Sequence, residues 1–146
     1  MGVNAKLYDR DFYAWTSEQA ALLRAGRVCE ADLVNIAEEI ESMGRSEKRE
    51  LVSRLVVLLL NLTKWRYQPS LRSRSWQTSI DERRLEIADV LSDNPSLRPT
   101  LPDFVAQAWR RAKFGAQRET GLEASTFPQD CPWTPEQAFD DAFWPE

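Results

Sequence analysis

Apolar residues recur at spacings of three and four along most of the chain, and this periodicity predicts helices. The most apolar stretch, Glu47–Tyr67, repeats leucines along one seam and carries a second apolar stripe beside it. The seam is Leu51, Leu55, Leu58, Leu62 and Trp65, and the second stripe is Val52, Val56 and Leu59. A helix that is apolar on most sides packs against several neighbours. We therefore expect it to be the central helix, ending before Pro69.

Four further helices are expected, two before the central one and two after it. They run from Asp9 to about Ala25, over Ala31–Met43, over about Ser75–Ser92, and from Pro102 to about Thr120. The second of them carries one apolar stripe, which consists of Leu33, Ile36, Ala37, Ile40 and Met43. Gly44 is expected to end that helix, and Ser46 to cap the central one.

The C-terminal tail, residues 122–146, is rich in proline and aromatic residues. Gly121 suits the end of the helix before it, and Thr134–Gln137 has the spacing of a capping box, which predicts a short helix. We expect the tail to pack across the bundle. Because no segment alternates like a strand, residues 1–146 are predicted to form a single all-α domain of about five helices.

The composition excludes some classes of function but does not identify one. The 146 residues are 42% hydrophobic, carry a net charge of −4 and include no histidine. Lack of histidine excludes Ser-His-Asp and Cys-His catalysis, and no metal site or cofactor is expected. Cys29 and Cys131 are isolated, as in reduced cytosolic proteins. No signal peptide or membrane span is recognisable, so we expect a cytoplasmic protein.

Several motifs carry a family resemblance. They are EEIESMGRSEKREL, LLNLTKWRYQP, SRSWQTSIDERR and TFPQDCPW. Together they resemble the bacterial domain-of-unknown-function family 29 over nearly the whole chain. The resemblance implies a helical single domain without an established activity or cofactor. Members often carry histidine where Asn61 stands and threonine where Ser79 stands. Asparagine replaces a histidine's hydrogen bond but not its proton transfer, which favours a structural role here.

A first candidate site is a polar cluster of Glu39, Glu41, Arg54, Asn61 and Arg84. The glutamates flank the apolar stripe of their helix, and Arg84 stands where an amphipathic helix normally carries an apolar residue. We expect the glutamates to pair with Arg54 and Arg84 and to fix the register of three helices. The alternative is that these groups line a cleft of a small-ligand enzyme, with Arg84 holding an anion.

A second candidate is the basic and aromatic segment 64–76. Lys64, Arg66, Arg72 and Arg74 occur there without an acidic residue, interleaved with aromatic side chains. Such a combination contacts phosphates and stacks on bases in nucleic-acid-binding proteins. The alternative interpretation is a solvated connection at the end of a helix, where cations are favoured.

Helix faces that stay apolar outside the main seams, such as those of Val57, Leu60 and Leu85, indicate contacts with another chain or burial under the tail. The leading functional hypothesis is a non-enzymatic helical interaction module, which binds itself or a partner protein. A nucleic-acid or anion binder is the first alternative, and an enzyme using the glutamate and arginine cluster is the second.

Overall fold

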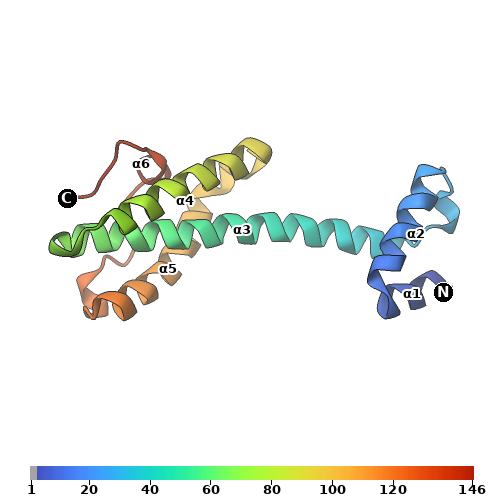
Figure 1. The fold of residues 1–146 in the computed structure, drawn as a ribbon, viewed down its shortest axis with the longest axis horizontal. Coiled ribbons are helices and arrows are strands. Elements are labelled where there is room, and N and C mark those ends of the chain that lie inside the picture. The colour runs from blue at the N-terminus through green and yellow to red at the C-terminus, as the bar shows by residue number, and fades with distance from the viewer. Residues whose placement is uncertain (1–2) are drawn as a thin grey trace. The chain divides into compact units, whose positions relative to one another are not determined.

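The computed structural model describes residues 3–146, with side chains from residue 7 onward (Figure 1). The described residues form six α-helices and no strand. The helices are α1 (Val3–Arg10), α2 (Phe12–Arg24), α3 (Leu33–Tyr67), α4 (Arg74–Asp93), α5 (Leu101–Thr120) and α6 (Pro135–Phe139). Short 3-10 turns connect several of them. The predicted all-α fold with a long central helix is confirmed.

The chain divides into two compact units, an N-terminal unit (Met1–Ser46) and a C-terminal unit (Glu47–Glu146). Helix α3 contributes its first part to the N-terminal unit and its longer remainder to the C-terminal unit. That residues 1–146 form a single domain stays a prediction.

Helix α3 continues through Gly44, so the expected helix end at Gly44 and the expected cap at Ser46 are wrong. A glycine inside a helix costs only about 0.5–1 kcal/mol relative to alanine, which does not outweigh the propensity of the residues around it. Arg45 Nη2 also donates to Glu38 Oε1 at 3.0 Å, and Arg45 Nη1 lies 3.9 Å from Glu41 Oε2. These pairs join the turns on either side of Gly44.

Replacing Gly44 with alanine should stabilise α3 by about 0.5–1 kcal/mol, because its φ is not positive and the new Cβ meets no atom within 4 Å. Slower amide exchange over residues 40–50 would report the gain. The matched control is Gly121→Ala, where φ is +73° and a side chain is strained, so stability should fall by about 1 kcal/mol. A loss of stability in Gly44→Ala would contradict the account.

The start of the chain differs from the single expected helix, because α1 ends at Arg10 and Asp11 caps α2. The Asp11 carboxylate accepts a hydrogen bond from the Ala14 backbone N–H at 3.0 Å, which satisfies a donor that the new helix leaves free. Gly26, at φ +74°, follows the end of α2. Trp15 is 3% exposed and its Nε1 donates to Asp32 Oδ2 at 3.1 Å, so it ties α2 to the start of α3.

The core of the C-terminal unit lies between α3, α4 and α5, and the tail closes it. Five leucines of α3 have no exposed surface, namely Leu51, Leu55, Leu58, Leu59 and Leu62. Small residues on α5 let α3 approach closely: a Cβ added at Gly115 would lie 3.2 Å from Leu60 Cδ2. The predicted capping box is present, with Thr134 and Gln137 bonded to each other's backbone N–H. Helix α3 is thus the central helix of this unit, as the spacing of its leucines predicted.

Buried side chains of α4 and α5 bind backbone carbonyls of the tail. Trp109 of α5 is 1% exposed and its Nε1 donates to the carbonyls of Pro128 and Gln129, both at 3.2 Å. Arg84 of α4 bonds to carbonyls further along the same segment. Because buried carbonyls need partners, these donors fix where the irregular backbone lies.

Candidate functional site

The five residues of the expected polar cluster are divided between the two units. Glu39 accepts a hydrogen bond from the Tyr8 hydroxyl, and Glu41 pairs with Arg45 at 3.9 Å, both within the N-terminal unit. Arg54, Asn61 and Arg84 belong to the C-terminal unit, and each has its own partners there. The contacts of the described residues thus differ from the glutamate–arginine network that the helical patterns predicted.

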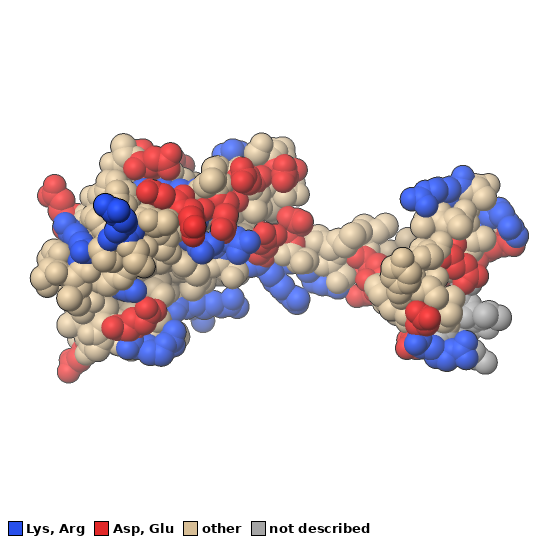
Figure 2. Space-filling model, viewed as in Figure 1, with Lys and Arg blue, Asp and Glu red and all other residues tan. Residues whose placement is uncertain are grey.

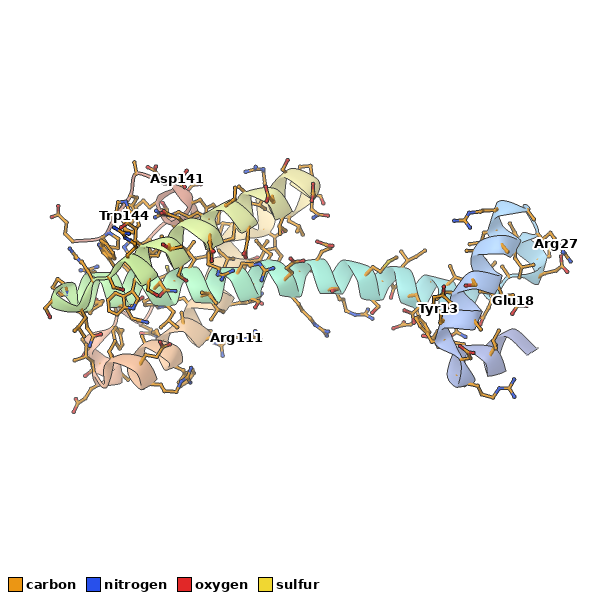
Figure 3. All side chains as sticks on the ribbon, viewed as in Figure 1. Tyr13, Glu18, Arg27, Arg111, Asp141 and Trp144 are labelled. Carbon is orange, nitrogen blue, oxygen red and sulfur yellow. The ribbon has the colours of Figure 1, made fainter. Side chains whose placement is uncertain are left out.

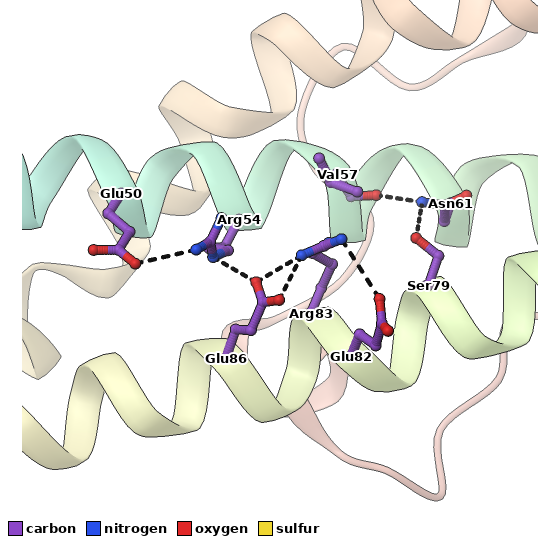
Figure 4. A network of polar contacts seen from close by, with 8 residues as sticks. All are labelled: Glu50, Arg54, Val57, Asn61, Ser79, Glu82, Arg83 and Glu86. Carbon is purple, nitrogen blue, oxygen red and sulfur yellow. Dashed lines mark hydrogen bonds and ion pairs between the residues drawn. The ribbon is translucent and has the colours of Figure 1, made fainter.

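Arg54 belongs to a smaller network that joins α3 to α4 (Figure 4). Its Nη2 donates to Glu50 Oε1 at 3.1 Å, and its Nε forms an ion pair of 2.5 Å with Glu86 Oε2. Arg83 donates to both carboxylate oxygens of Glu86, at 2.7 and 2.6 Å, so Glu86 is shared by two arginines. Glu86 was not among the residues predicted for the polar cluster. The Arg83–Glu86 spacing of three residues on one helix was the signal that could have found it.

Arg84 is 3% exposed and binds carbonyls of the tail rather than a glutamate side chain. Its Nε donates to the Ala138 carbonyl at 2.8 Å and its Nη2 to the Phe143 carbonyl at 2.7 Å. The guanidinium lies 5.3 Å from the centre of the Trp144 ring. Burial lowers the pKa of Arg84, and nearby carboxylates such as Asp141 act in the opposite direction. The planar fork of donors explains why arginine stands on an otherwise apolar stripe.

Asn61 and Ser79 contact each other across α3 and α4. Asn61 Nδ2 donates to Ser79 Oγ at 3.1 Å and to the Val57 carbonyl at 2.9 Å (Figure 4). Asn61 is 7% exposed, and neither side chain is ionisable. Their arrangement is that of a helix-to-helix contact and offers no group for proton transfer.

The hydrogen bond from Tyr8 to Glu39 predicts a pH dependence. The bond is the largest cause that raises the pKa of Tyr8 from 10.0 to about 12, followed by burial and by the charge of Glu39. Because the folded pKa is the higher one, the stabilising effect is fully present below pH 10 and is lost as pH rises through about 12.

Replacing Glu39 with glutamine should therefore return the pKa of Tyr8 towards 10.0, as measured by tyrosinate absorbance. Glu38→Gln is the matched control, because Glu38 is one of the smaller causes of the shift. An unchanged titration in Glu39→Gln would contradict the bond.

The basic and aromatic segment is largely engaged within the C-terminal unit. Lys64 Nζ donates to Glu119 Oε1 at 3.1 Å and lies 4.7 Å from the Trp76 ring centre. Arg72 donates to the carbonyls of Trp65 and Pro145, at 2.7 and 3.3 Å, and covers the Trp65 ring. The Arg66 guanidinium lies 5.3 Å from the Tyr67 ring centre, and Arg74 is exposed at the start of α4. Lys64 and Arg72 thus connect the end of α3 to α5 and to the tail.

The apolar stripe in the first part of α3 is exposed, whereas the apolar stripe of an amphipathic helix normally faces a packed core. Within the N-terminal unit, Leu33, Ile40 and Met43 are 49%, 59% and 62% exposed, and Ala37 is exposed as well. Trp15 and Gln19 are the buried residues of the described part of this unit. We name Leu33, Ile36, Ala37, Ile40 and Met43 the α3 stripe.

Neither a metal-binding group nor a membrane-spanning helix is found in the described part of the chain. No group of three or more Cys, Asp or Glu side chains there is placed to hold a metal ion. None of its helices combines the length and the apolar character that crossing a bilayer requires. Both cysteines are free thiols.

The chain matches one family model, described as "Domain of unknown function DUF29", over residues 7–144. The match agrees with the resemblance that the central motifs carry. Neither a curated protein nor a solved structure matches the chain.

Proposed function

The chain belongs to the DUF29 family of domains of unknown function, and we propose that it is a non-enzymatic helical interaction module that associates with a second copy of itself through the α3 stripe. The observation that carries this proposal is the exposure of the stripe. Apolar side chains at heptad-like spacing form the seam into which another helix packs.

The size of the N-terminal unit supports the need for a partner. A unit of 46 residues buries a small share of its surface and is only marginally stable, so association would stabilise it. Further large apolar side chains of the unit are exposed, among them Phe12, Tyr13 and Val34. An apolar helix face repeated on a second copy would bury the two stripes against each other in one symmetric contact.

The alternatives have less support. A nucleic-acid binder would use Lys64, Arg66, Arg72 and Arg74. The donors of Lys64 and Arg72 bind an acidic side chain and backbone carbonyls. An enzyme of the glutamate and arginine cluster would need Arg84 to hold an anion, and its Nε and Nη2 already donate to carbonyls.

The proposal is tested with Ile40→Gln combined with Met43→Gln, which keeps the net charge and good helix propensity. Burying an apolar side chain of this size stabilises by about 1.5–3 kcal/mol, so the dissociation constant of the dimer should rise more than tenfold. Sedimentation velocity over a range of concentrations measures it. Leu71→Gln is the control, because Leu71 is 56% exposed in the C-terminal unit.

A wild-type chain that stays monomeric at high concentration would refute the proposal. Equal dissociation constants for the wild type and the double variant would refute it too. If the stripe binds a different protein, the wild type would associate no more tightly than the double variant, and self-association through the stripe would be wrong.

A further inference from the structure

Two outer helix faces of the C-terminal unit carry the same arrangement with opposite charge. Each face has one exposed large apolar residue at its centre, Leu85 on α4 and Phe114 on α5, at 65% and 69% exposure. Around each centre, charged residues occupy the positions four before, three before and four after. They are Asp81, Glu82 and Asp89 on α4, and Arg110, Arg111 and Arg118 on α5. We name these the acidic face and the basic face.

The acidic face includes a hollow next to Leu85. The hollow has a volume of about 390 Å³, and its lining consists of three apolar residues, two carboxylates and one arginine: Leu85, Ala88, Phe139, Asp81, Asp141 and Arg84. Its apolar lining and acidic surroundings suit an aromatic side chain flanked by cations. Acidic side chains gather along the α4 side of the C-terminal unit in Figure 2.

The basic face presents such a side chain. Phe114 projects from α5 between Arg110, Arg111 and Arg118, all of which are exposed. In the described part of the chain, none of these three arginines has an ion-pair partner within the molecule. Figure 3 shows Arg111 and Asp141 on opposite sides of the C-terminal unit, so one molecule cannot close this contact on itself.

We propose that the basic face of one copy docks on the acidic face of a second copy, with Phe114 seated in the hollow beside Leu85. The occupant is a second copy because the two faces have the same spacing of residues and the same type of central residue, and because their charges are opposite in sign. The contact joins two different surfaces, so each copy keeps one face free for the next. Copies therefore add in rows or close into a ring. This contact is separate from that of the α3 stripe.

Exposed ion pairs contribute about 0.2–1 kcal/mol each and are screened by salt. The contact should therefore weaken as ionic strength rises, with Phe114 supplying the part that salt does not remove. An apolar contact such as that of the α3 stripe does not share this salt dependence, which separates the two associations.

The decisive experiment is a charge exchange in the Ile40→Gln, Met43→Gln background, which removes the α3-stripe contact. One variant carries Arg110→Glu with Arg111→Glu, and the other carries Asp81→Lys with Asp89→Lys. Each variant alone opposes like charges, so its dissociation constant should rise roughly tenfold or more. Mixed one to one, the two variants again pair opposite charges in both contacts, and association should return.

The control variant, Arg74→Glu with Arg98→Glu, changes the net charge equally at exposed positions of the same unit and should associate like the background. Sedimentation velocity of each variant and of the mixture reads out all cases. A background that shows no association, a reversed variant that associates like the background, or a mixture that stays monomeric would each overturn the inference. None of these outcomes would decide whether the wild-type chain associates through the α3 stripe, because that contact is absent from the background used.

Discussion

Replacing Trp109 with alanine should lower the free energy of unfolding of the C-terminal unit by about 3–5 kcal/mol. Trp109 is 1% exposed, and its ring meets that of Trp133 edge to face with centres 6.0 Å apart. The substitution leaves a large cavity between α5 and the tail. It also removes the donor to the Pro128 carbonyl, while the Gln129 carbonyl keeps the hydrogen bond from Lys113 Nζ at 3.0 Å. Both losses act on the same segment of the tail.

Trp109→Phe separates the two losses. Phenylalanine keeps most of the packing but cannot donate a hydrogen bond, and a hydrogen bond contributes about 1 kcal/mol on average. The loss should therefore be clearly smaller than for alanine. Urea unfolding followed by far-UV circular dichroism measures both. A loss below about 1 kcal/mol for Trp109→Ala would show that the tail does not depend on this anchor.

Replacing Arg84 with methionine should destabilise the C-terminal unit by about 3 kcal/mol or more. Two hydrogen bonds from a charged donor contribute about 1.5–3 kcal/mol each, and the Ala138 and Phe143 carbonyls would lose their donor. Methionine fills much of the space, so packing alone predicts a small effect. Arg84→Lys should not restore stability, because an ammonium group lacks the fork that reaches both carbonyls.

Arg83→Met is the matched control for Arg84→Met. Arg83 precedes Arg84 on the same helix, but its side chain is 23% exposed and paired with Glu86 and Glu82. Glu86 keeps its ion pair with Arg54 when Arg83 is replaced, so no carboxylate is left without a partner and the loss of stability should be clearly smaller than for Arg84→Met. Proteolysis within residues 127–146 should become faster in Arg84→Met only. Equal stability of the two variants would refute the role of Arg84 in anchoring the tail.

The parts of the fold that could be predicted depend on local chemistry. The leucine seam of Glu47–Tyr67 predicted the central helix, and the spacing of Thr134 and Gln137 predicted the capping box. Gly121 ended α5 because only a residue without a side chain easily adopts its φ of +73°. Each of these signals involves residues within a few positions of each other.

The parts that could not be predicted depend on which elements meet. Gly44 resembles a helix end locally, yet the flanking residues and the Arg45 pairs keep α3 continuous. The side chain of Arg84 was expected to meet a glutamate, and it meets two carbonyls of the tail. Periodicity shows that the α3 stripe is apolar, but it does not show whether another helix of the same chain covers it.

Amide hydrogen exchange over residues 33–43, measured as a function of protein concentration, tests most directly whether the α3 stripe is a contact between copies. If two copies associate through the α3 stripe, protection of this segment rises with concentration in the wild type and stays low in Ile40→Gln, Met43→Gln. Residues 51–62, which contain the buried leucines of α3, should be protected at every concentration. Protection over residues 33–43 that does not change with concentration would contradict the account.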